Sequence, residues 1–285
     1  EDVLVLEPTS GTGSAPKLIP YTRSLQREFS AAIDPWLAGL FLRFPSLLLG
    51  RQYWSVSPNT HAVPDREPGA VRIGFETDAD YLGPVARRLS RHVMTVPPEL
   101  SEVTDADAFE YLTLLFLLRD ARLRLISVWH PSFLTLLLDA LPGHWDRLLA
   151  DIRSGSLRDD IDVPDTVRPA LLRALRPEPA QADALAALDP AAPGSAGRIW
   201  PRLRVISCWT RDGEAWLSRL RKAFPAAWIQ PKGLIATEGI VSLPVGGGDR
   251  QVAAVRSHYL EFLDRENGQT RPLWKLSPDR EYVVV

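Results

Sequence analysis

Hydroxyl and glycine residues gather near the start of the chain in a loop that could bind phosphate. The loop follows the apolar run 3–6, which predicts a strand, and a lysine closes it. Backbone N–H groups and hydroxyls in such a loop can converge on one anion, and the lysine supplies a counter-charge. Ordinary turns share this composition, so both interpretations stay open on these residues alone. The candidate phosphate ligands are Thr9, Ser10, Gly11, Thr12, Gly13 and Lys17.

The spacing excludes two well-known phosphate loops. A Walker A loop needs Gly-Lys followed by Ser or Thr, whereas Lys17 stands between Pro16 and Leu18. A dinucleotide fingerprint needs a third glycine at the helix entry, where Pro16 stands. The loop therefore belongs to another class.

A second segment, residues 232–239, pairs a hydroxyl with a carboxylate. Thr237 can bind a phosphate oxygen and Glu238 can bind Mg²⁺, because hard cations prefer oxygen ligands. Gly233 and Leu234 precede this pair, and the segment lies between two short predicted strands. Strand ends are where α/β sheets commonly present ligands. A capping pair in a turn is the alternative explanation.

The composition limits the classes of function. The chain has 285 residues, of which 45% are hydrophobic, and a net charge of −2. This is enough for a large core and too balanced for a nucleic-acid surface. The single cysteine, Cys208, excludes an intrachain disulfide and agrees with a reducing cytosol, so we expect a cytoplasmic protein. The longest apolar run, 111–118, is too short to span a bilayer, so we expect no membrane partner.

The elements that must position these residues alternate between strand and helix along the chain, which predicts an α/β fold. Strands are predicted at 52–57, 123–129, 203–209 and 228–230, and helices at 25–41, 104–122, 131–141, 145–154, 164–175, 179–188 and 213–224. We further expect a loop at 58–69, a helix at 81–92, a loop at 190–197, a helix cap at Asp212 and a glycine turn at 246–249. Pro35 is expected to kink or divide its helix. The β-rich stretches 240–243, 252–255 and 259–263, with a hairpin signal at Asn267-Gly268, predict an antiparallel C-terminal portion.

Five segments in order along the chain resemble the Gretchen Hagen (auxin-responsive promoter) family of acyl-acid amido synthetases, in its bacterial form. This family belongs to the adenylate-forming, firefly luciferase-like superfamily. The segments are 9–12 with their exit at 17–22, 145–155, 198–202, 236–239 and 259–262. The resemblance implies the large N-terminal domain of the adenylate-forming fold, with mixed β-sheets layered with helices.

The resemblance also implies a ligase that uses ATP and Mg²⁺ to join a small carboxylic acid to an amine such as an amino acid. Ser10, Thr12 and Lys17 would hold the β- and γ-phosphates, Thr237 the α-phosphate and Glu238 the metal. Lys17, Thr237 and Glu238 are therefore the expected catalytic residues. Thr9, Gly11, Gly13, Gly233 and Leu234 would complete the nucleotide site.

The acid pocket of this family is lined by the helix after the phosphate loop and by strand ends. The candidates here are Trp129, Ser132, Phe133, Trp209, Thr210 and Ile240. Each could equally be an ordinary core or strand-end residue.

The chain also departs from the family pattern. Leu234 stands where the superfamily often has a tyrosine that stacks on adenine, and residues 14–16 replace the second glycine of the phosphate loop. A third motif, whose aspartate holds the ribose, is absent. We therefore expect residues 1–285 to be a single large adenylation domain that stops before that motif and before the small C-terminal lid domain. An acyl-CoA-type ligase and a catalytically silent acyl- or nucleotide-binding module remain alternatives.

Overall fold

The computed structural model describes residues 2–9, 17–56, 71–73, 93–211, 213–245 and 248–285. Most of the phosphate loop and the whole of the predicted loop at 58–69 and of the predicted helix at 81–92 lie outside these ranges. The predicted cap Asp212 and the start of the glycine turn also lie outside them.

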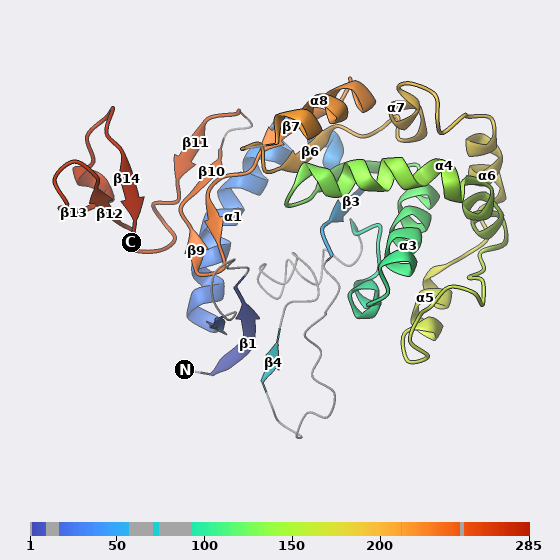
Figure 1. The fold of residues 1–285 in the computed structure, drawn as a ribbon, viewed down its shortest axis with the longest axis horizontal. Coiled ribbons are helices and arrows are strands. Elements are labelled where there is room, and N and C mark those ends of the chain that lie inside the picture. The colour runs from blue at the N-terminus through green and yellow to red at the C-terminus, as the bar shows by residue number, and fades with distance from the viewer. Residues whose placement is uncertain (1, 10–16, 57–70, 74–92, 212, 246–247) are drawn as a thin grey trace.

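A parallel four-stranded sheet forms the centre of the fold (Figure 1). Its order is β3 (Arg51–Trp54), β5 (Leu123–Ser127), β6 (Val205–Cys208) and β7 (Trp228–Pro231). β5 and β6 are almost completely buried because helices cover both faces of the sheet. The predicted α/β fold is confirmed.

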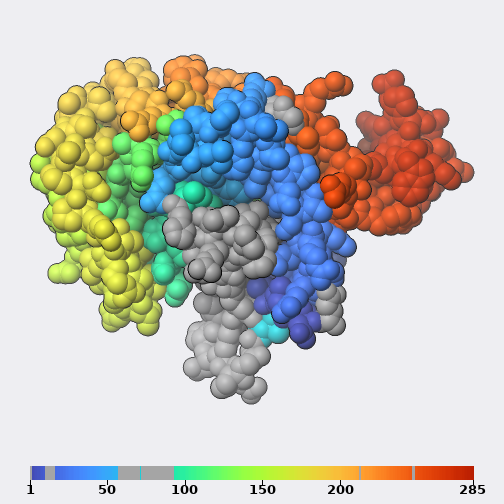
Figure 2. All heavy atoms as spheres, turned by 180° about the vertical axis from the view of Figure 1, so that it is seen from behind, coloured from blue at the N-terminus to red at the C-terminus, as the bar shows by residue number. Residues whose placement is uncertain are grey.

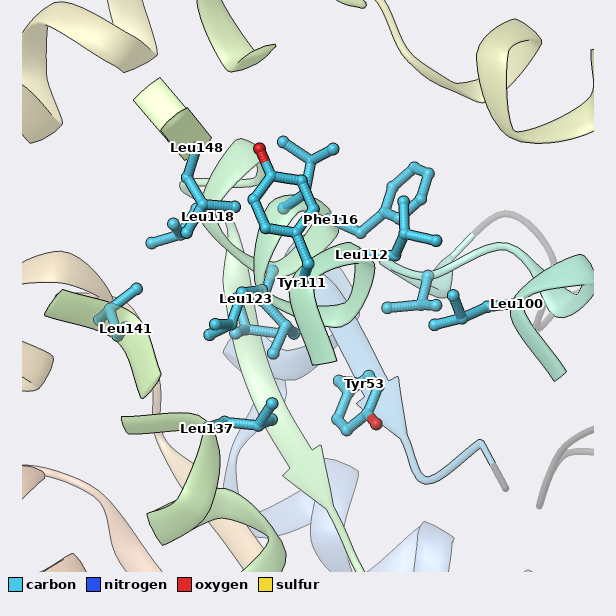
Figure 3. Close-up of a cluster of buried hydrophobic side chains, with 14 of the residues drawn as sticks. Tyr53, Leu100, Tyr111, Leu112, Phe116, Leu118, Leu123, Leu137, Leu141 and Leu148 are labelled. Carbon is cyan, nitrogen blue, oxygen red and sulfur yellow. The ribbon is translucent and has the colours of Figure 1, made fainter. Parts of the chain in front are cut away.

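The register assigns each side chain to one face of the sheet. One row across the strands consists of Trp54, Ser127, Ser207 and Gln230. The preceding row consists of Tyr53, Ile126, Ile206 and Ile229, and it faces the other way because successive strand residues alternate. The first row packs under α1 (Arg23–Arg43), and the second under α3 (Ala106–Arg119), α4 (Pro131–Ser154) and α8 (Glu214–Ala223). Figure 3 shows Tyr53 and Leu123 of the sheet gathered with leucines of α3 and α4.

Helix α3 is buried on all sides. Asp105 caps it by accepting a hydrogen bond from the N–H of Ala108 at 2.8 Å. Tyr111 donates a hydrogen bond to the Asp151 carboxylate of α4 at 2.8 Å. Burial raises the pKa of Asp151 above its usual range, although this hydrogen bond and nearby arginines oppose the shift. The pair joins the two longest helices on this face of the sheet.

Helix α4 is continuous, and the prediction of two helices at 131–141 and 145–154 was wrong. Pro142 lies inside the helix and is exposed. A proline there costs about 3 kcal/mol. Leu134, Leu141 and Leu148 continue one buried stripe past it, and each buried leucine contributes about 1.5–3 kcal/mol. The stripe therefore outweighs the proline, and the helix ends at Gly155, which has a left-handed φ of 66°.

Helix α1 also runs past a proline. Thr22 caps it by accepting from the N–H of Leu25 at 3.3 Å, and Pro35 lies in its interior without dividing it. The remaining short helices are η1 (Pro45–Leu49), η3 (Pro98–Glu102), α5 (Arg168–Ala174), α6 (Pro179–Ala186) and α7 (Ser195–Ile199). Helix α7 occupies part of 190–197, so the loop predicted there was partly wrong.

Smaller sheets surround one end of the central sheet. β1 (Val3–Pro8) lies between β2 (Leu18–Thr22) and β4 (Arg72–Ile73). The pairs β8 (Ile235–Ala236) with β9 (Gly239–Ile240) and β10 (Ser242–Pro244) with β11 (Gln251–Ala253) are antiparallel. Both β9 and β10 contact α1, so this edge of the molecule is where the N-terminal and C-terminal parts of the chain meet.

A three-stranded antiparallel sheet ends the chain and lies at the side of the molecule (Figures 1 and 2). It consists of β12 (Glu261–Asp264) between β13 (Thr270–Pro272) and β14 (Tyr282–Val284), with η4 (Leu273–Lys275) following β13. The predicted turn at Asn267-Gly268 joins two of its strands, and Gly268 has a φ of 69°. The buried Asp264 accepts a hydrogen bond from Arg280 at 2.9 Å, which fixes the ends of this sheet together.

No helix among the described residues is both long enough and apolar enough to cross a bilayer.

Candidate functional site

The stem of the first motif is a closed hairpin. β1 and β2 pair antiparallel up to Pro8 and Leu18. Beyond them the N–H of Thr9 donates to the carbonyl of Lys17 at 2.8 Å, and the N–H of Lys17 donates to the Thr9 hydroxyl at 3.1 Å. Ser10, Gly11, Thr12 and Gly13 lie outside the described residues. The structure therefore brings the two ends of the loop together, and the exposed Lys17 side chain stands at its exit.

The second motif is a tight hairpin. β8 and β9 pair directly, so Thr237 and Glu238 form its two-residue turn, with Glu238 exposed. Gly233 is packed so tightly against β10 that a Cβ atom would overlap the carbonyl of Ser242. Leu234 precedes β8 and is 52% exposed, and its N–H donates to the Ser242 hydroxyl at 3.1 Å. The hairpin tip thus presents the Glu238 carboxylate to solvent, next to the half-buried Thr237, from a fixed base.

A hydrogen bond joins the strand after the first motif to the second motif. The buried Tyr21 of β2 donates from its hydroxyl to the carbonyl of Thr237 at 2.6 Å. Tyr21 follows the phosphate loop by a few residues, whereas Thr237 lies 216 positions further along the chain. The far half of β2, the strand that follows the loop, and the Thr-Glu turn therefore lie beside one another.

The ring of His258 packs against the β8–β9 hairpin. A Cβ atom at Gly239 would lie 3.0–3.1 Å from the ring of His258, so the ring packs directly on the backbone of β9. The Nε2 atom of His258 lies 3.4 Å from the Glu28 carboxylate of α1. Its Nδ1 atom lies 2.6 Å from the hydroxyl of Ser257, which donates to the Glu28 carbonyl. Burial lowers the pKa of His258, although Glu28 opposes the shift.

An apolar cavity lies between α1, the carboxyl ends of the central strands and the hairpin. Its aromatic walls are Phe29, Trp36, Trp54 and Trp129, and its aliphatic walls are Ile33, Ile235, Ile240, Leu243 and Pro244. Ser127 and Lys232 are its polar lining residues. The space between these walls, counted together with the open solvent at its mouth, measures about 520 Å³.

Buried glutamines hold two of the aromatic walls in place. The indole N–H of Trp36 donates to Gln230 at 2.8 Å, and that of Trp54 donates to Gln52 at 3.1 Å. Both bonds satisfy the polar edge of the indole. The cavity is therefore formed by rings of fixed orientation.

The structure brings some of the predicted pocket residues to this cavity and leaves others elsewhere. Trp129 and Ile240 line it, and Trp209 packs edge-on against Trp129 with ring centroids 6.1 Å apart. The Trp209 indole also donates to the carbonyl of Gly233 at 3.2 Å. Thr210 follows Trp209 and is half-buried.

Ser132 and Phe133 are not among the residues that line the cavity. The ring of Phe133 stacks on Tyr53 at 6.4 Å, within the core on the opposite face of the sheet. The hydroxyl of Ser132 lies 2.6 Å from Nδ1 of His130, at the start of α4. Both residues therefore serve packing and helix capping in this structure.

Sequence reasoning missed most of the cavity walls. Phe29, Ile33 and Trp36 recur at helical spacing, which indicates a buried face but not a void beside it. Lys232 was also missed. The signal that could have found it is a lysine two positions after the predicted strand 228–230, at a strand end where ligands are commonly bound.

The donor set suits a metal ion that arrives with a nucleotide. Among the described residues, no group of three or more His, Cys, Asp or Glu side chains forms a ready metal site. Mg²⁺ is usually held by one or two carboxylates together with substrate phosphates. The exposed carboxylate of Glu238, next to the hydroxyl of Thr237, fits that arrangement.

Comparisons of sequence and of structure with known proteins identify the same family. A sequence model described as "GH3 family N-terminal domain" matches residues 1–227. The chain is similar to a solved structure described as "AtGH3.15 acyl acid amido synthetase in complex with 2,4-DB", with 18% identity and a TM-score of 0.78 over 99% of this chain and 50% of that one. A second, "GH3.15 acyl acid amido synthetase", has 18% identity and a TM-score of 0.76 over 100% of this chain and 51% of that one. Comparison with curated proteins gave no match.

These similarities show the fold of the chain and how much of the longer solved structures it covers. The chain spans about half the length of the two solved structures. At 18% identity they establish a shared architecture. The second motif at 232–239 lies beyond the residues that the family model matches, so the geometry around Thr237 carries the argument for that part of the site.

Proposed function

This chain belongs to the GH3 family, and from that membership we propose that the protein is an ATP-dependent ligase that adenylates a carboxylic acid and transfers the acyl group to an amine. The observation that carries the proposal is the hydrogen bond from Tyr21 to Thr237. It joins the strand that follows the candidate phosphate loop with a Thr-Glu turn, directly beside an apolar cavity. An adenylating enzyme needs these three features next to one another.

Both motifs contribute residues to the proposed nucleotide site. Ser10, Thr12 and Lys17 hold the β- and γ-phosphates, while Thr9, Gly11 and Gly13 shape the loop around them. Thr237 binds the α-phosphate, and Gly233 and Leu234 lie along the adenosine side. Glu238 would hold Mg²⁺, which would supply charge neutralisation at the phosphate oxygens. The support for these roles is the contact between β2, the strand that follows the loop, and the hairpin tip.

The first reaction step is mainly one of positioning. The acid lies in the cavity with its carboxylate toward the hairpin, and a carboxylate oxygen attacks the α-phosphorus of ATP while pyrophosphate leaves. Lys17 and Thr237 stabilise charge that develops on the phosphates. The amine, an amino acid in our proposal, then attacks the acyl carbon, forming the amide and releasing AMP. Residues 1–285 contribute one adenylation domain to this reaction.

ATP–pyrophosphate exchange in the full-length protein, driven by a panel of carboxylic acids, tests the proposal. We expect exchange that depends on the acid, on ATP and on Mg²⁺. Product analysis with amino acids and with coenzyme A then identifies the acceptor. A binding module would bind acid or nucleotide without exchange, and that result would refute a ligase.

A conservative variant tests the observation that carries the proposal. Tyr21→Phe removes only the hydroxyl that joins the motifs, so we expect exchange to fall about tenfold, which corresponds to one lost hydrogen bond of about 1.4 kcal/mol. Tyr282→Phe is the matched control, because that hydroxyl accepts from the N–H of Ser277 in the C-terminal sheet. Equal exchange in both variants would show that the link between the motifs is unimportant.

A further inference from the structure

Three leucines at the junction of α1 and η1 point away from the core. Leu42 is 82% exposed, Leu48 is 65% exposed and Leu49 is 76% exposed, which makes them the three most exposed leucines of the described part of the chain. The adjacent Leu47 is completely buried in the core beside α1, and η1 contacts α1, β3 and β5. The turn that carries the exposed leucines is therefore anchored to the fold. It belongs to the light-blue surface at the top of Figure 2.

A row of arginines begins next to this turn, at the amino ends of the central strands. A Cβ atom at Gly50 would overlap the side chain of Arg124 on β5, so the segment that follows Leu49 lies directly against that arginine. The N–H of Arg204 donates to the carbonyl of Arg124 at 2.9 Å, which places Arg204 beside it at the start of β6. The arginines and the leucines therefore share one edge of the sheet.

The row continues past the next strand and returns to α1. The carbonyl of Arg204 accepts from the N–H of Trp228 at 2.8 Å, and the guanidinium group of Arg43 lies 4.5 Å from the centroid of the Trp228 ring. Arg43 directly follows Leu42, so these contacts form one continuous surface around the amino ends of β5, β6 and β7. We call this surface the leucine–arginine corner, and it consists of Leu42, Arg43, Leu48, Leu49, Arg124 and Arg204.

The leucine–arginine corner carries positive charge that the fold does not neutralise. Arg124 and Arg204 are half-buried and form no ion pair with any of the described residues. The nearby Asp120 is shared between Arg51 and Arg122, with N–O distances of 3.1 and 3.2 Å. An arginine without a carboxylate partner can bind phosphate oxygens with its planar fork of donors. Protruding apolar side chains and anion-binding groups therefore lie side by side.

We propose that the leucine–arginine corner docks the protein on an anionic lipid surface, with its leucines at the boundary of headgroups and acyl chains and its arginines on headgroup phosphates. Apolar side chains beside basic ones bind proteins to such an interface. A fluid lipid surface closes around side chains that protrude singly, whereas a protein partner needs a fitted pocket for each of them. The high exposure of Leu42 and Leu49 therefore favours lipid as the occupant.

Docking at this corner leaves the residues of the proposed ligase site untouched. The corner lies at the amino ends of the parallel strands, whereas Trp54, Ser127 and Lys232 line the cavity from the carboxyl ends. Lipid docking and ligase activity can therefore be measured separately. Such docking needs no apolar run of bilayer length, because a docked protein lies on the surface and does not span it.

Co-sedimentation of the full-length protein with vesicles tests the docking. The vesicles contain phosphatidylcholine alone, or phosphatidylcholine with about 30% phosphatidylserine. We expect binding to the anionic vesicles to be at least about tenfold tighter than to the neutral ones and to weaken as salt is raised. Leu48→Ser combined with Leu49→Ser should weaken binding to the anionic vesicles about tenfold or more, because the interface then buries less apolar area.

A second pair of substitutions tests the charge. Arg124→Gln combined with Arg204→Gln should weaken binding to the anionic vesicles about tenfold and reduce its dependence on salt. Leu136→Ser and Arg153→Gln, at an exposed leucine and an exposed arginine of α4, are the matched controls and should leave binding unchanged. Pyrophosphate exchange without vesicles should be the same in all of these variants. The leucine pair alone decides the outcome if the arginine pair fails to fold.

Three results overturn the docking: no binding of the wild type to anionic vesicles, equal binding to neutral and anionic vesicles, or a leucine pair that binds as tightly as the wild type. Light scattering adds a further test. Self-association that the leucine pair abolishes, without any vesicle binding, would assign the corner to contact between two copies of the protein. Vesicle binding by a wild type that shows no pyrophosphate exchange would refute the ligase and leave the docking surface.

Discussion

Lys17 and Glu238 carry the charges on which the proposed nucleotide chemistry depends, and both side chains are exposed. The fold uses the backbone of Lys17, through its two hydrogen bonds with Thr9, to close the stem of the loop. Glu238 occupies a turn that is held by its neighbours and by Tyr21. A substitution at either position should therefore change the proposed nucleotide binding without changing the stability of the fold.

Replacing Lys17 by alanine should weaken ATP binding without unfolding the protein. The change removes a charge-assisted hydrogen bond to phosphate, and we expect a loss of about 1.5–3 kcal/mol of binding free energy. Calorimetric titration with ATP measures this. Lys275→Ala, at an exposed lysine of the C-terminal sheet, is the control, and identical affinities in the two variants would remove Lys17 from the phosphate site.

Glu238→Gln should lower Mg²⁺-dependent exchange by about a hundredfold, because a neutral amide is a poor ligand for a hard cation. The midpoint of thermal unfolding should not change, since the side chain is exposed. Glu102→Gln provides an exposed matched control in η3. Should Glu238→Gln unfold, or retain full exchange, the carboxylate serves the turn and not the metal.

The hairpin β8–β9 is the element that aims the Thr-Glu pair, and its base leaves no room for a side chain. Gly233→Ala would drive a Cβ atom into the carbonyl of Ser242, which is backbone and cannot rotate away. We expect a loss of about 2–4 kcal/mol of unfolding free energy together with loss of exchange. Urea denaturation gives the free energy.

In contrast to Gly233→Ala, we expect Gly143→Ala to stabilise the element that contains it. Gly143 is exposed inside α4, and an added Cβ atom would meet nothing within 4 Å. The variant should gain about 0.5–1 kcal/mol from the helix propensity of alanine. Destabilisation in both variants would indicate a general intolerance, and the specific fit at Gly233 would then be in doubt.

The sequence predicted elements more successfully than it predicted their junctions. Strand β5 and helix α3 follow from apolar runs of the right length, with Asp105 as a visible cap. Helix α4 does not, because the effect of Pro142 depends on a buried stripe that only the assembled core defines. The same reason explains the cavity. Trp129 could be nominated from a strand end, but Trp36 and Lys232 line the same cavity only after a helix and a strand far apart in sequence have packed together.

Across the whole molecule, His258 connects α1, the hairpin and the segment that leads to the C-terminal sheet. Because burial lowers its pKa in the folded state, the unfolded chain binds a proton first as pH falls below about 6.5. Folding stability that depends on His258 is therefore present at pH 7.5 and is lost as pH falls through that window.

We expect the unfolding free energy of the wild type to fall more between pH 7.5 and pH 5.5 than that of His258→Gln. Urea denaturation at the two pH values measures both differences, and the contributions of the other histidines cancel in the comparison. An equal fall in the two proteins would show that the ring is not buried uncharged. A smaller fall in the wild type would show that Glu28 dominates and raises the pKa.

The bond between Tyr21 and Thr237 has a consequence for the order of events during protein synthesis. Its two partners are 216 positions apart, and ribosomes add about 5–20 residues per second, so roughly 10–45 s separate their appearance. During that interval the nascent chain already carries α1, whose Phe29, Ile33 and Trp36 have no hairpin to close the cavity over them. The nascent N-terminal part therefore leaves these side chains uncovered on this side, and the site is complete only after residues 235–240 have emerged.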